Sequence, residues 1–390
     1  MCAFADQVTK IQMEDAMAGR AFLIVAGSPE ASEALRMYLE GQGEIRSLPP
    51  RVSPEEVKEA VRQLEEEGKD VVIVSSAPFA YGSGNYLVPT FAFAPEDRGK
   101  TLSPEDLLAR LKDVSQVAVF DREDLAELAS VSFRDTFAEA AEAPASKVVT
   151  RHQGLVDFLQ HYGVVRPDAE VITHVADPSQ IAGEVVAGVL PPHLAKHALA
   201  VETPPPLNLT PGTELSREEM EERLRSMGIE PPGTRRYAVL DLEDPAVLGE
   251  LLQARREAGV HYPGSRAEAL LERTLQAVEI PPPLAESFRE RLEEVLAEMR
   301  ERRIPEGSPP LFSDKVRIIE ATIEGALGAD RLTLEHAARI QVAADQAFQN
   351  LREATTTWQA ALYVEPVDFA LRDLYREAGL SAGRKEVELD

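Results

Sequence analysis

Short apolar runs alternate with amphipathic stretches along the first third of the chain. The runs AFLIVAG (21–27), VVIVSS (71–76) and VAVFD (117–121) are rich in β-branched residues and have the length of buried strands. Helical patterns separate them, and two of these start with a serine followed by a proline, at Ser53 and Ser103, as helix N-termini commonly do. This alternation predicts a mainly parallel sheet covered by helices.

The same order of patterns returns in the next hundred residues. Three further strands are predicted there, namely KVVTR (147–151), EVITHV (170–175) and EVVAGVL (184–190). Residues 213–224 match residues 100–111 at 5 of 12 positions, and residues 237–245 match residues 117–125 at 5 of 9. Because the matches keep their order at similar spacing, they predict a tandem duplication.

Beyond residue 245 the chain is rich in Ala, Leu, Glu and Arg, with apolar residues at three- and four-residue spacing. We therefore expect an α/β protein made of two tandem Rossmann-like lobes with mainly parallel sheets, followed by an all-α domain. The expected divisions are an N-terminal extension (1–20), a first lobe (21–130), a second lobe (146–245), a helical domain (248–380) and a charged tail (381–390).

The charge and cysteine content narrow the classes of partner. Acidic residues outnumber basic ones by 67 to 41, for a net charge of −26. This charge repels a nucleic-acid backbone, so we expect no DNA partner, although a local pocket can still bind a short nucleotide. The single cysteine, Cys2, excludes a disulfide framework and agrees with a reducing compartment. No apolar run has the length of a membrane span and no secretory pattern is seen, so we expect a cytoplasmic protein without a membrane partner.

Five of the seven histidines lie between residues 152 and 197. His152 directly follows one predicted strand, and His193 starts a helix that follows another. Open α/β sheets bind ligands at the carboxyl ends of strands, and a helix N-terminus offers free N–H groups to a phosphate. Arg151 adds a fixed positive charge. The chain has no H-E-x-x-H or H-x-H pattern and no cysteine partner near these histidines, so we expect no metal and no cofactor.

The stretches KVVTRHQG, EVITHVADP, VVAGVLPPHLA and TELSREEMEERL together resemble a family of small CRISPR-associated proteins. That family accompanies type III systems and is associated with ring-nuclease activity toward cyclic oligoadenylates. The likeness covers about residues 147–240, and the residues that fall on its pattern are Thr150, Arg151, His152, Gly154, His174, Leu190, Pro191, His193 and Leu194. Members are usually single small domains, whereas this chain adds a preceding lobe and a helical domain. The first lobe also has AGSPEA (26–31) where the second has TRHQGL, and so lacks the arginine and histidine.

The resemblance implies that the chain binds a cyclic oligoadenylate, with cyclic tetra-adenylate favoured, between its two lobes. It also implies cleavage by metal-independent attack of a ribose 2′-hydroxyl, with catalytic roles for Arg151, His152 and His193. The expected ligand contacts are Thr150, Gly154, His174, Leu190, Pro191 and Lys196 in the second lobe and Ser28, Ser75, Ser76 and Ala77 in the first. The glycine-rich stretch AYGSGNY (80–86) is expected to be either part of this cradle or a plain flexible connection.

Two other functions stay open at this point. One is a sensor that binds the ring without cutting it and signals through the helical domain to a protein partner. The other is a ligand-activated helical ribonuclease, because RLTLEH (331–336) and REAGVH (256–261) have an R-x4-H spacing that places Arg331 with His336. Thr333 resembles a helix N-cap, which would divide the first of these motifs. The apolar faces of the helical domain also leave a homodimer open.

Overall fold

The computed structural model describes most of the chain between residues 19 and 372. The described residues are 19–50, 52–77, 80–97, 100–131, 136–205, 214–278, 280, 282–302, 304, 310–329, 331–352, 364–367, 369–370 and 372. Most of the expected N-terminal extension, including Cys2, and the whole charged tail lie outside these residues.

Ten strands form one mixed sheet. Their order across the sheet is β2-β1-β3-β4-β5-β10-β9-β8-β6-β7. The strands of the first half are β1 (Arg20–Ile24), β2 (Glu44–Ser47), β3 (Asp70–Val74), β4 (Gly84–Phe91) and β5 (Leu111–Asp121). Those of the second half are β6 (Ala145–Val149), β7 (Val165–Ile172), β8 (Val185–Gly188), β9 (Ala200–Thr203) and β10 (Arg235–Asp241).

The two halves of this sheet have the same strand order when each is counted from its outer edge. In each half the first four strands are parallel, and the fifth strand is antiparallel to the fourth. The fifth strands, β5 and β10, pair antiparallel at the centre, where Val119 lies opposite Val239 and the register continues evenly on both sides. The predicted α/β fold with a mostly parallel sheet is confirmed. The two lobes, however, share one sheet instead of having one each, and their origin by duplication stays a prediction.

Among the described residues, ten short helices cover this sheet or connect its strands. They are α2 (Pro29–Tyr38), α3 (Pro54–Glu66), η2 (Pro95–Asp97), α4 (Pro104–Arg110), α5 (Arg122–Ser130), α6 (Thr136–Glu142), α7 (Gln153–His161), η3 (Pro178–Gln180), α8 (Pro192–Ala195) and α9 (Arg217–Ser226). Serine N-caps start four of them, as the sequence pattern suggests, because each serine hydroxyl accepts a hydrogen bond from a backbone N–H of the first turn.

The helices that follow the fifth strand of each half cross over to the other half. The Ala140 carbonyl in α6, which follows β5, accepts a hydrogen bond from Arg236 of β10 (2.7 Å). After β10 come α10 (Pro245–His261) and α11 (Arg266–Gln276). The Arg273 carbonyl of α11 accepts a hydrogen bond from Asn85 of β4 (3.0 Å), and the next carbonyl past the helix end, that of Ala277, accepts one from Gln116 of β5 (2.8 Å). The crossing ties the two halves into one unit.

One face of the sheet carries a hydrophobic cluster that is continuous across both halves. It joins Ile73 and Tyr86 of the first half, Val119 and Val239 at the centre and Leu190 of the second half, and residues of α3 and α8 pack into it. On the other face α2 packs on the first half, and α5, α6, α7 and α9 pack on the second. The halves therefore share a core as well as a sheet.

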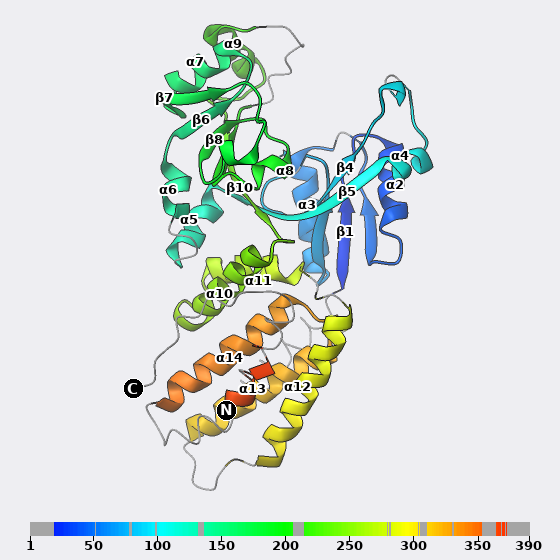
Figure 1. The fold of residues 1–390 in the computed structure, drawn as a ribbon, viewed down its shortest axis with the longest axis vertical. Coiled ribbons are helices and arrows are strands. Elements are labelled where there is room, and N and C mark those ends of the chain that lie inside the picture. The colour runs from blue at the N-terminus through cyan, green and yellow to red at the C-terminus, as the bar shows by residue number, and fades with distance from the viewer. Residues whose placement is uncertain are drawn as a thin grey trace.

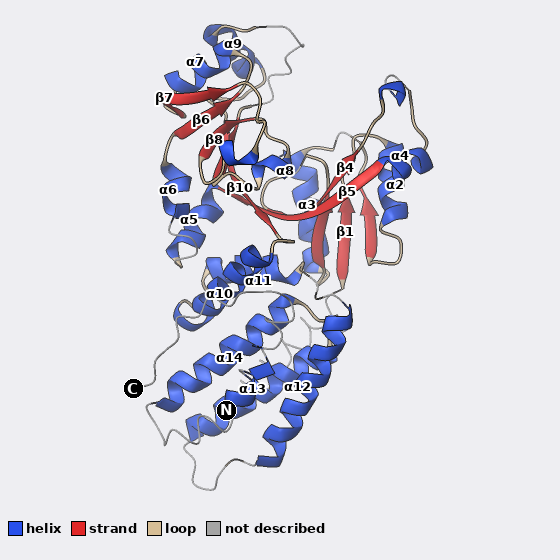
Figure 2. Cartoon of the chain, in the orientation of Figure 1, coloured by secondary structure: helices blue, strands red, loops and turns tan. Residues whose placement is uncertain are grey.

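Three long helices form a region apart from the sheet. They are α12 (Pro282–Arg302), α13 (Pro310–Gly328) and α14 (Leu334–Arg352). Figure 1 shows the two halves of the sheet at one end of the molecule, this bundle at the other, and α10 and α11 between them. Figure 2 shows that the strands are confined to the sheet end. In the described part of the chain, no helix is long and apolar enough to cross a membrane.

The apolar pattern missed β2, β4 and β9. The stretch 80–86 needs a correction, because its last three residues, Gly84 to Tyr86, belong to β4 instead of a loop. Tyr86 is fully buried, and its hydroxyl donates a hydrogen bond to the Gly82 carbonyl (2.7 Å). Glycines at 82 and 84, both with positive φ, made a strand start look like a flexible loop.

Candidate functional site

The carboxyl ends of three adjacent parallel strands lie at one edge of the second half. The central strand is β6, and its Val149 is paired with Ile172 of β7 on one side and Gly188 of β8 on the other. The residues that follow each strand therefore emerge together, since neighbouring strands are about 4.8 Å apart. This edge brings together residues 150–152, 173–174 and 189–193, which hold most of the predicted second-lobe site.

His152 stands at the N-cap of α7 but makes no capping bond with its own side chain. Its Nδ1 lies 3.0 Å from Oε2 of Glu214, and the other oxygen of that carboxylate accepts the Gly154 N–H (2.9 Å). The pKa of Glu214 is lowered from its ordinary value, most of all by the hydrogen bond from the Gly154 N–H and next by the hydrogen bond with the His152 side chain. Glu214 was not among the predicted site residues. A carboxylate of the chain thus stands at the helix N-terminus where the sequence argument placed a phosphate.

Gly154 is required for a reason that the sequence argument did not contain. A Cβ added at this position would lie 2.0 Å from the Leu215 carbonyl oxygen. That oxygen belongs to the segment that carries Glu214 into α9, and it packs directly on the first turn of α7. Contact of Gly154 with a ligand stays a prediction, and the close approach that the structure shows is that of the Leu215 carbonyl.

The other predicted residues of this edge differ in exposure. Arg151 and His174 are exposed, and the Arg151 Nε donates only a long hydrogen bond to the Thr173 carbonyl (3.4 Å). The Thr150 hydroxyl accepts the His152 N–H (3.1 Å) and so bends the chain out of the strand. His193 is exposed at the start of the four-residue helix α8. Arg151, His174 and His193 are therefore accessible to a ligand.

Three other residues of the predicted second-lobe site already have structural roles. Leu190 is 4% exposed and belongs to the shared hydrophobic cluster. Pro191 is the N-cap of α8. Lys196 forms an ion pair with Asp241 at the end of β10 (2.6 Å). Leu190 is thus a core residue, and a ligand would contact it only after repacking.

The predicted first-lobe residues lie at the matching edge of the first half. Ser28 caps α2 by accepting the Ala31 N–H (3.2 Å). Ser75 is buried and its hydroxyl accepts the Ala77 N–H (3.1 Å), whereas Ser76 and Ala77 are exposed. Four strands separate β3 from β8, on the order of 24 Å along the sheet, and the two strands run in opposite directions, so the residues after β3 and those after β8 leave the sheet at opposite edges. A ligand that touches both edges must be large.

The arrangement of Arg331 and His336 does not resemble a ribonuclease site. Arg331 forms an ion pair with Asp70 of β3, and α14 begins at Leu334, between the two motif residues. The His336 Nδ1 accepts the Thr333 N–H (3.0 Å), and burial lowers the pKa of His336 to about 4. Thr333 accepts the His336 N–H in return (3.4 Å), as expected of an N-cap. His336 is therefore neutral and engaged at a helix start.

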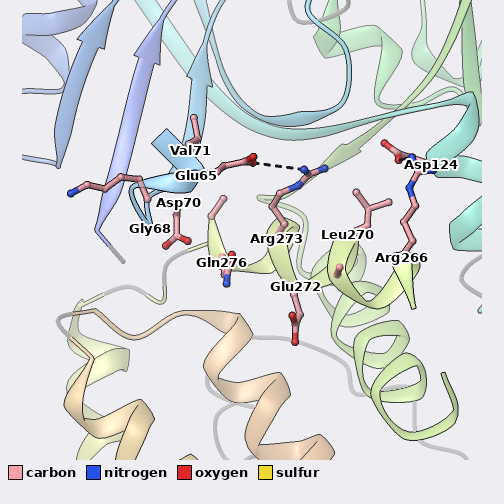
Figure 3. A pocket seen from close by; sticks show the side chains of 13 residues that line it. Glu65, Gly68, Asp70, Val71, Asp124, Arg266, Leu270, Glu272, Arg273 and Gln276 are labelled. Atoms are coloured by element: carbon pink, nitrogen blue, oxygen red, sulfur yellow. Dashed lines mark hydrogen bonds and ion pairs between the residues drawn. The ribbon is translucent and has the colours of Figure 1, made fainter. Parts of the chain in front are cut away.

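A recess lies away from this edge, at the amino end of β3, between the end of α3 and α11. Figure 3 shows Arg266 and Arg273 of α11 pointing into it, and its volume is about 460 Å³. Arg273 pairs with Glu65 (3.7 Å) and Arg266 with Asp124 (3.2 Å). Because its arginines have carboxylate partners of the chain itself, we interpret this recess as part of the joint between the first half and the helical region.

No group of three or more histidine, cysteine, aspartate or glutamate side chains that could hold a metal is found among the described residues. The fold and the site together define a Rossmann-like α/β protein with exposed arginine and histidine side chains at a strand-end edge, the usual ligand position of such sheets.

Comparison with protein families adds a more specific likeness. Residues 147–228 match the model of a family described as a CRISPR-associated protein, Cas_VVA1548. The matched segment contains Arg151, His152, His193 and Glu214, and it supports a CRISPR-associated protein. No curated protein and no solved structure matches the chain.

Sequence reasoning found His152 but not its partner, which lies 62 residues further along the chain. One signal was present. Where residues 100–103 read KTLS, residues 213–216 read TELS, so the second half has Glu214 where the first has Thr101.

Proposed function

We propose that the protein binds a cyclic oligoadenylate second messenger of type III CRISPR signalling, with cyclic tetra-adenylate as the favoured ring, and opens it at the His152 edge. The observation that carries the proposal is a partly exposed histidine whose Nδ1 contacts a carboxylate, within the segment that matches a CRISPR-associated family. The like-ordered halves of the sheet add support, because a ring with rotational symmetry suits a pseudo-symmetric protein.

The proposed reaction needs no metal. The ribose 2′-oxygen attacks the adjacent phosphorus, so an O2′–P bond forms and the P–O5′ bond breaks. The proton of the 2′-hydroxyl passes to Nε2 of His152, and the leaving 5′-oxygen takes up a proton, which gives a 2′,3′-cyclic phosphate and a free 5′-hydroxyl. Arg151 contributes a positive charge to the phosphate as its negative charge grows. His193 is the alternative proton carrier on the same edge.

The test is incubation of the purified chain with labelled cyclic tetra- and hexa-adenylate in the presence of EDTA. We expect 2′,3′-cyclic phosphate products from the wild type. His152→Ala should slow ring opening by roughly 10²–10³ while binding is nearly kept, and Arg151→Ala should weaken both. His261→Ala, which removes an exposed histidine of α10, is the matched control. Unchanged cleavage in His152→Ala with loss in His193→Ala would move the proton step to α8, and absence of cleavage by the wild type would overturn the proposal.

A second candidate function is a sensor that binds the ring and signals through the helical region. Contacts between the first half and that region favour it. Asp70 of β3 pairs with Arg331 ahead of α14, and the carbonyls at the end of α11 accept hydrogen bonds from Asn85 and Gln116. Movement of the first half would therefore be transmitted to the helices. Tight ring binding without products, in the same assay, would favour the sensor.

A further inference from the structure

The hydrogen bond between His152 and Glu214 has a chemical consequence for the imidazole. A carboxylate only accepts hydrogen bonds, so a close contact with Nδ1 requires the proton of a neutral ring to sit on Nδ1. Nε2 then carries the free lone pair. The His152 side chain is 32% exposed, so the ring is partly accessible from solvent. The carboxylate thus selects the tautomer that can accept a proton.

Glu214 is held in place by the backbone around it. Its second oxygen accepts the Gly154 N–H (2.9 Å), and the following Leu215 carbonyl packs on Gly154. Two residues further, Ser216 begins α9 with a capping box in which Glu219 also takes part. The contacts of Glu214 and of the two residues that follow it therefore hold it in place, although its side chain is 54% exposed.

The first half of the chain has neither His152 nor Glu214 at the equivalent positions. The N-cap of the helix after the first strand is His152 in the second half and Ser28 in the first. The fourth strand of each half is followed by a helix with a serine N-cap, Ser216 of α9 in the second half and Ser103 of α4 in the first. Two positions before that serine, the second half has Glu214 and the first has Thr101. In the first half Ser28 caps its own helix, so no external carboxylate is needed there.

We propose that Glu214 is a positioning residue for ring opening, which orients His152 and keeps the proton of the neutral imidazole on Nδ1 so that Nε2 accepts the proton of the ribose 2′-hydroxyl. This inference rests on the proposed function, and it names the residue that makes the histidine competent. The role differs from simple helix capping, because a cap needs only an acceptor for the Gly154 N–H.

Glu214→Gln separates the two roles. The amide oxygen of glutamine keeps the bond from the Gly154 N–H, because the opposite orientation would set two donors against each other. The amide NH₂ then faces His152 and donates to Nδ1, which moves the ring proton to Nε2. We expect the rate of ring opening at saturating ligand to fall on the order of 10²-fold, since general-base catalysis typically contributes 10²–10⁴. Ring affinity and melting temperature should be close to those of the wild type.

The tautomer is measured without any substrate. In protein labelled with ¹⁵N-histidine, the long-range proton–nitrogen correlation of His152, assigned by comparison with His152→Gln, distinguishes Nδ1–H from Nε2–H. We expect Nδ1–H in the wild type and Nε2–H in Glu214→Gln. Glu218→Gln is the matched control, because Glu218 is an exposed carboxylate of α9 that pairs with Arg217.

The two readouts distinguish failure of the inference from failure of the proposed function. The same tautomer in the wild type and in Glu214→Gln would overturn the positioning role whatever the rates. An inverted tautomer with unchanged ring opening would also overturn it. An inverted tautomer in a protein whose wild type opens no ring would support the control of His152 by Glu214 and overturn only the ring-opening reaction.

Discussion

Replacement of Gly154 by alanine tests the packing that places Glu214 beside His152. The new Cβ would lie 2.0 Å from the Leu215 oxygen, 3.2 Å from the Leu215 carbonyl carbon and 3.4 Å from Cε of Met220. The methionine can move, but the carbonyl belongs to a backbone segment that the capping box of Ser216 anchors at the next residue. The strain must therefore displace the segment from Glu214 to Ser216 or the start of α7.

Two opposing effects set the magnitude. Alanine in place of glycine near a helix start gains about 0.5–1 kcal/mol from helix propensity and from a less flexible unfolded chain. Insertion of a methyl group into closely packed surroundings costs about 1–3 kcal/mol. We expect a net loss of about 1–2 kcal/mol in the free energy of unfolding, measured by urea denaturation followed by circular dichroism.

Gly325→Ala in α13 is the control, because a Cβ there meets no atom within 4 Å beyond its chain neighbours and the backbone of its own helix. It should raise the free energy of unfolding by up to about 1 kcal/mol. If Gly154→Ala were as stable as Gly325→Ala, the contact between Leu215 and the first turn of α7 would not exist as described. A Gly154→Ala protein that is destabilised but keeps the Nδ1–H tautomer of His152 would show that the strain is relieved away from Glu214.

Two further predictions concern buried charges. Glu202 and Arg236 form a 2.6 Å ion pair in which each side chain is 2% exposed, so Glu202→Gln should lower the free energy of unfolding by about 3 kcal/mol in urea denaturation, because the arginine would lose its closest counter-charge. The control is Glu67→Gln, in an exposed pair with Arg46, which should lower it by less than about 1 kcal/mol. Equal losses in the two variants would refute the reasoning. Burial raises the pKa of Glu335 to about 7 against the attraction of Arg339 and Arg255, so between pH 4.5 and 7 the folded state holds a proton that the unfolded state lacks, and the free energy of unfolding falls as pH rises. Relative to Glu335→Gln, the wild type should lose up to about 3 kcal/mol between pH 5 and 8 in paired urea titrations, and a constant difference between the two proteins across this range would contradict the assignment.

Much of the fold could be read from the sequence because its signals are local. The central strands β1, β3 and β8 are buried over most of their length on both faces, so they appear as nearly unbroken apolar runs. Helix starts are marked by serine caps within three residues of the groups they satisfy. The edge strand β2 gave no such signal, because its four residues are only half-buried or exposed. The sharing of one sheet by both halves depends on the pairing of β5 with β10, which no local pattern encodes.

The candidate site was only partly predictable, for a related reason. The rule that parallel strands place ligand residues at their carboxyl ends located Arg151, His152 and His193 at one edge. The rule does not say which of the residues after a strand are buried in the core or already bonded to other parts of the chain. Leu190 and Ser75 follow strands just as His193 does, yet the core buries both of them. Glu214 follows no strand, and only the packing of α9 against α7 brings it to His152.

The charge of Glu214 is the feature that a mere binding site would not favour. A carboxylate near the phosphates of an anionic ring repels them, and the chain as a whole is already strongly acidic. The first half has Ser28 and Thr101 in the equivalent places and would avoid this repulsion if the proposed ring binds there. In the second half the repulsion is reduced, because the N–H groups at the start of α7 and the imidazole of His152 both face the carboxylate. Glu214 would thus lower the affinity for the ring in the second half only. Under the proposed function, this difference is consistent with separate roles, in which the first half contributes binding and the second contributes the proton transfer that opens the ring.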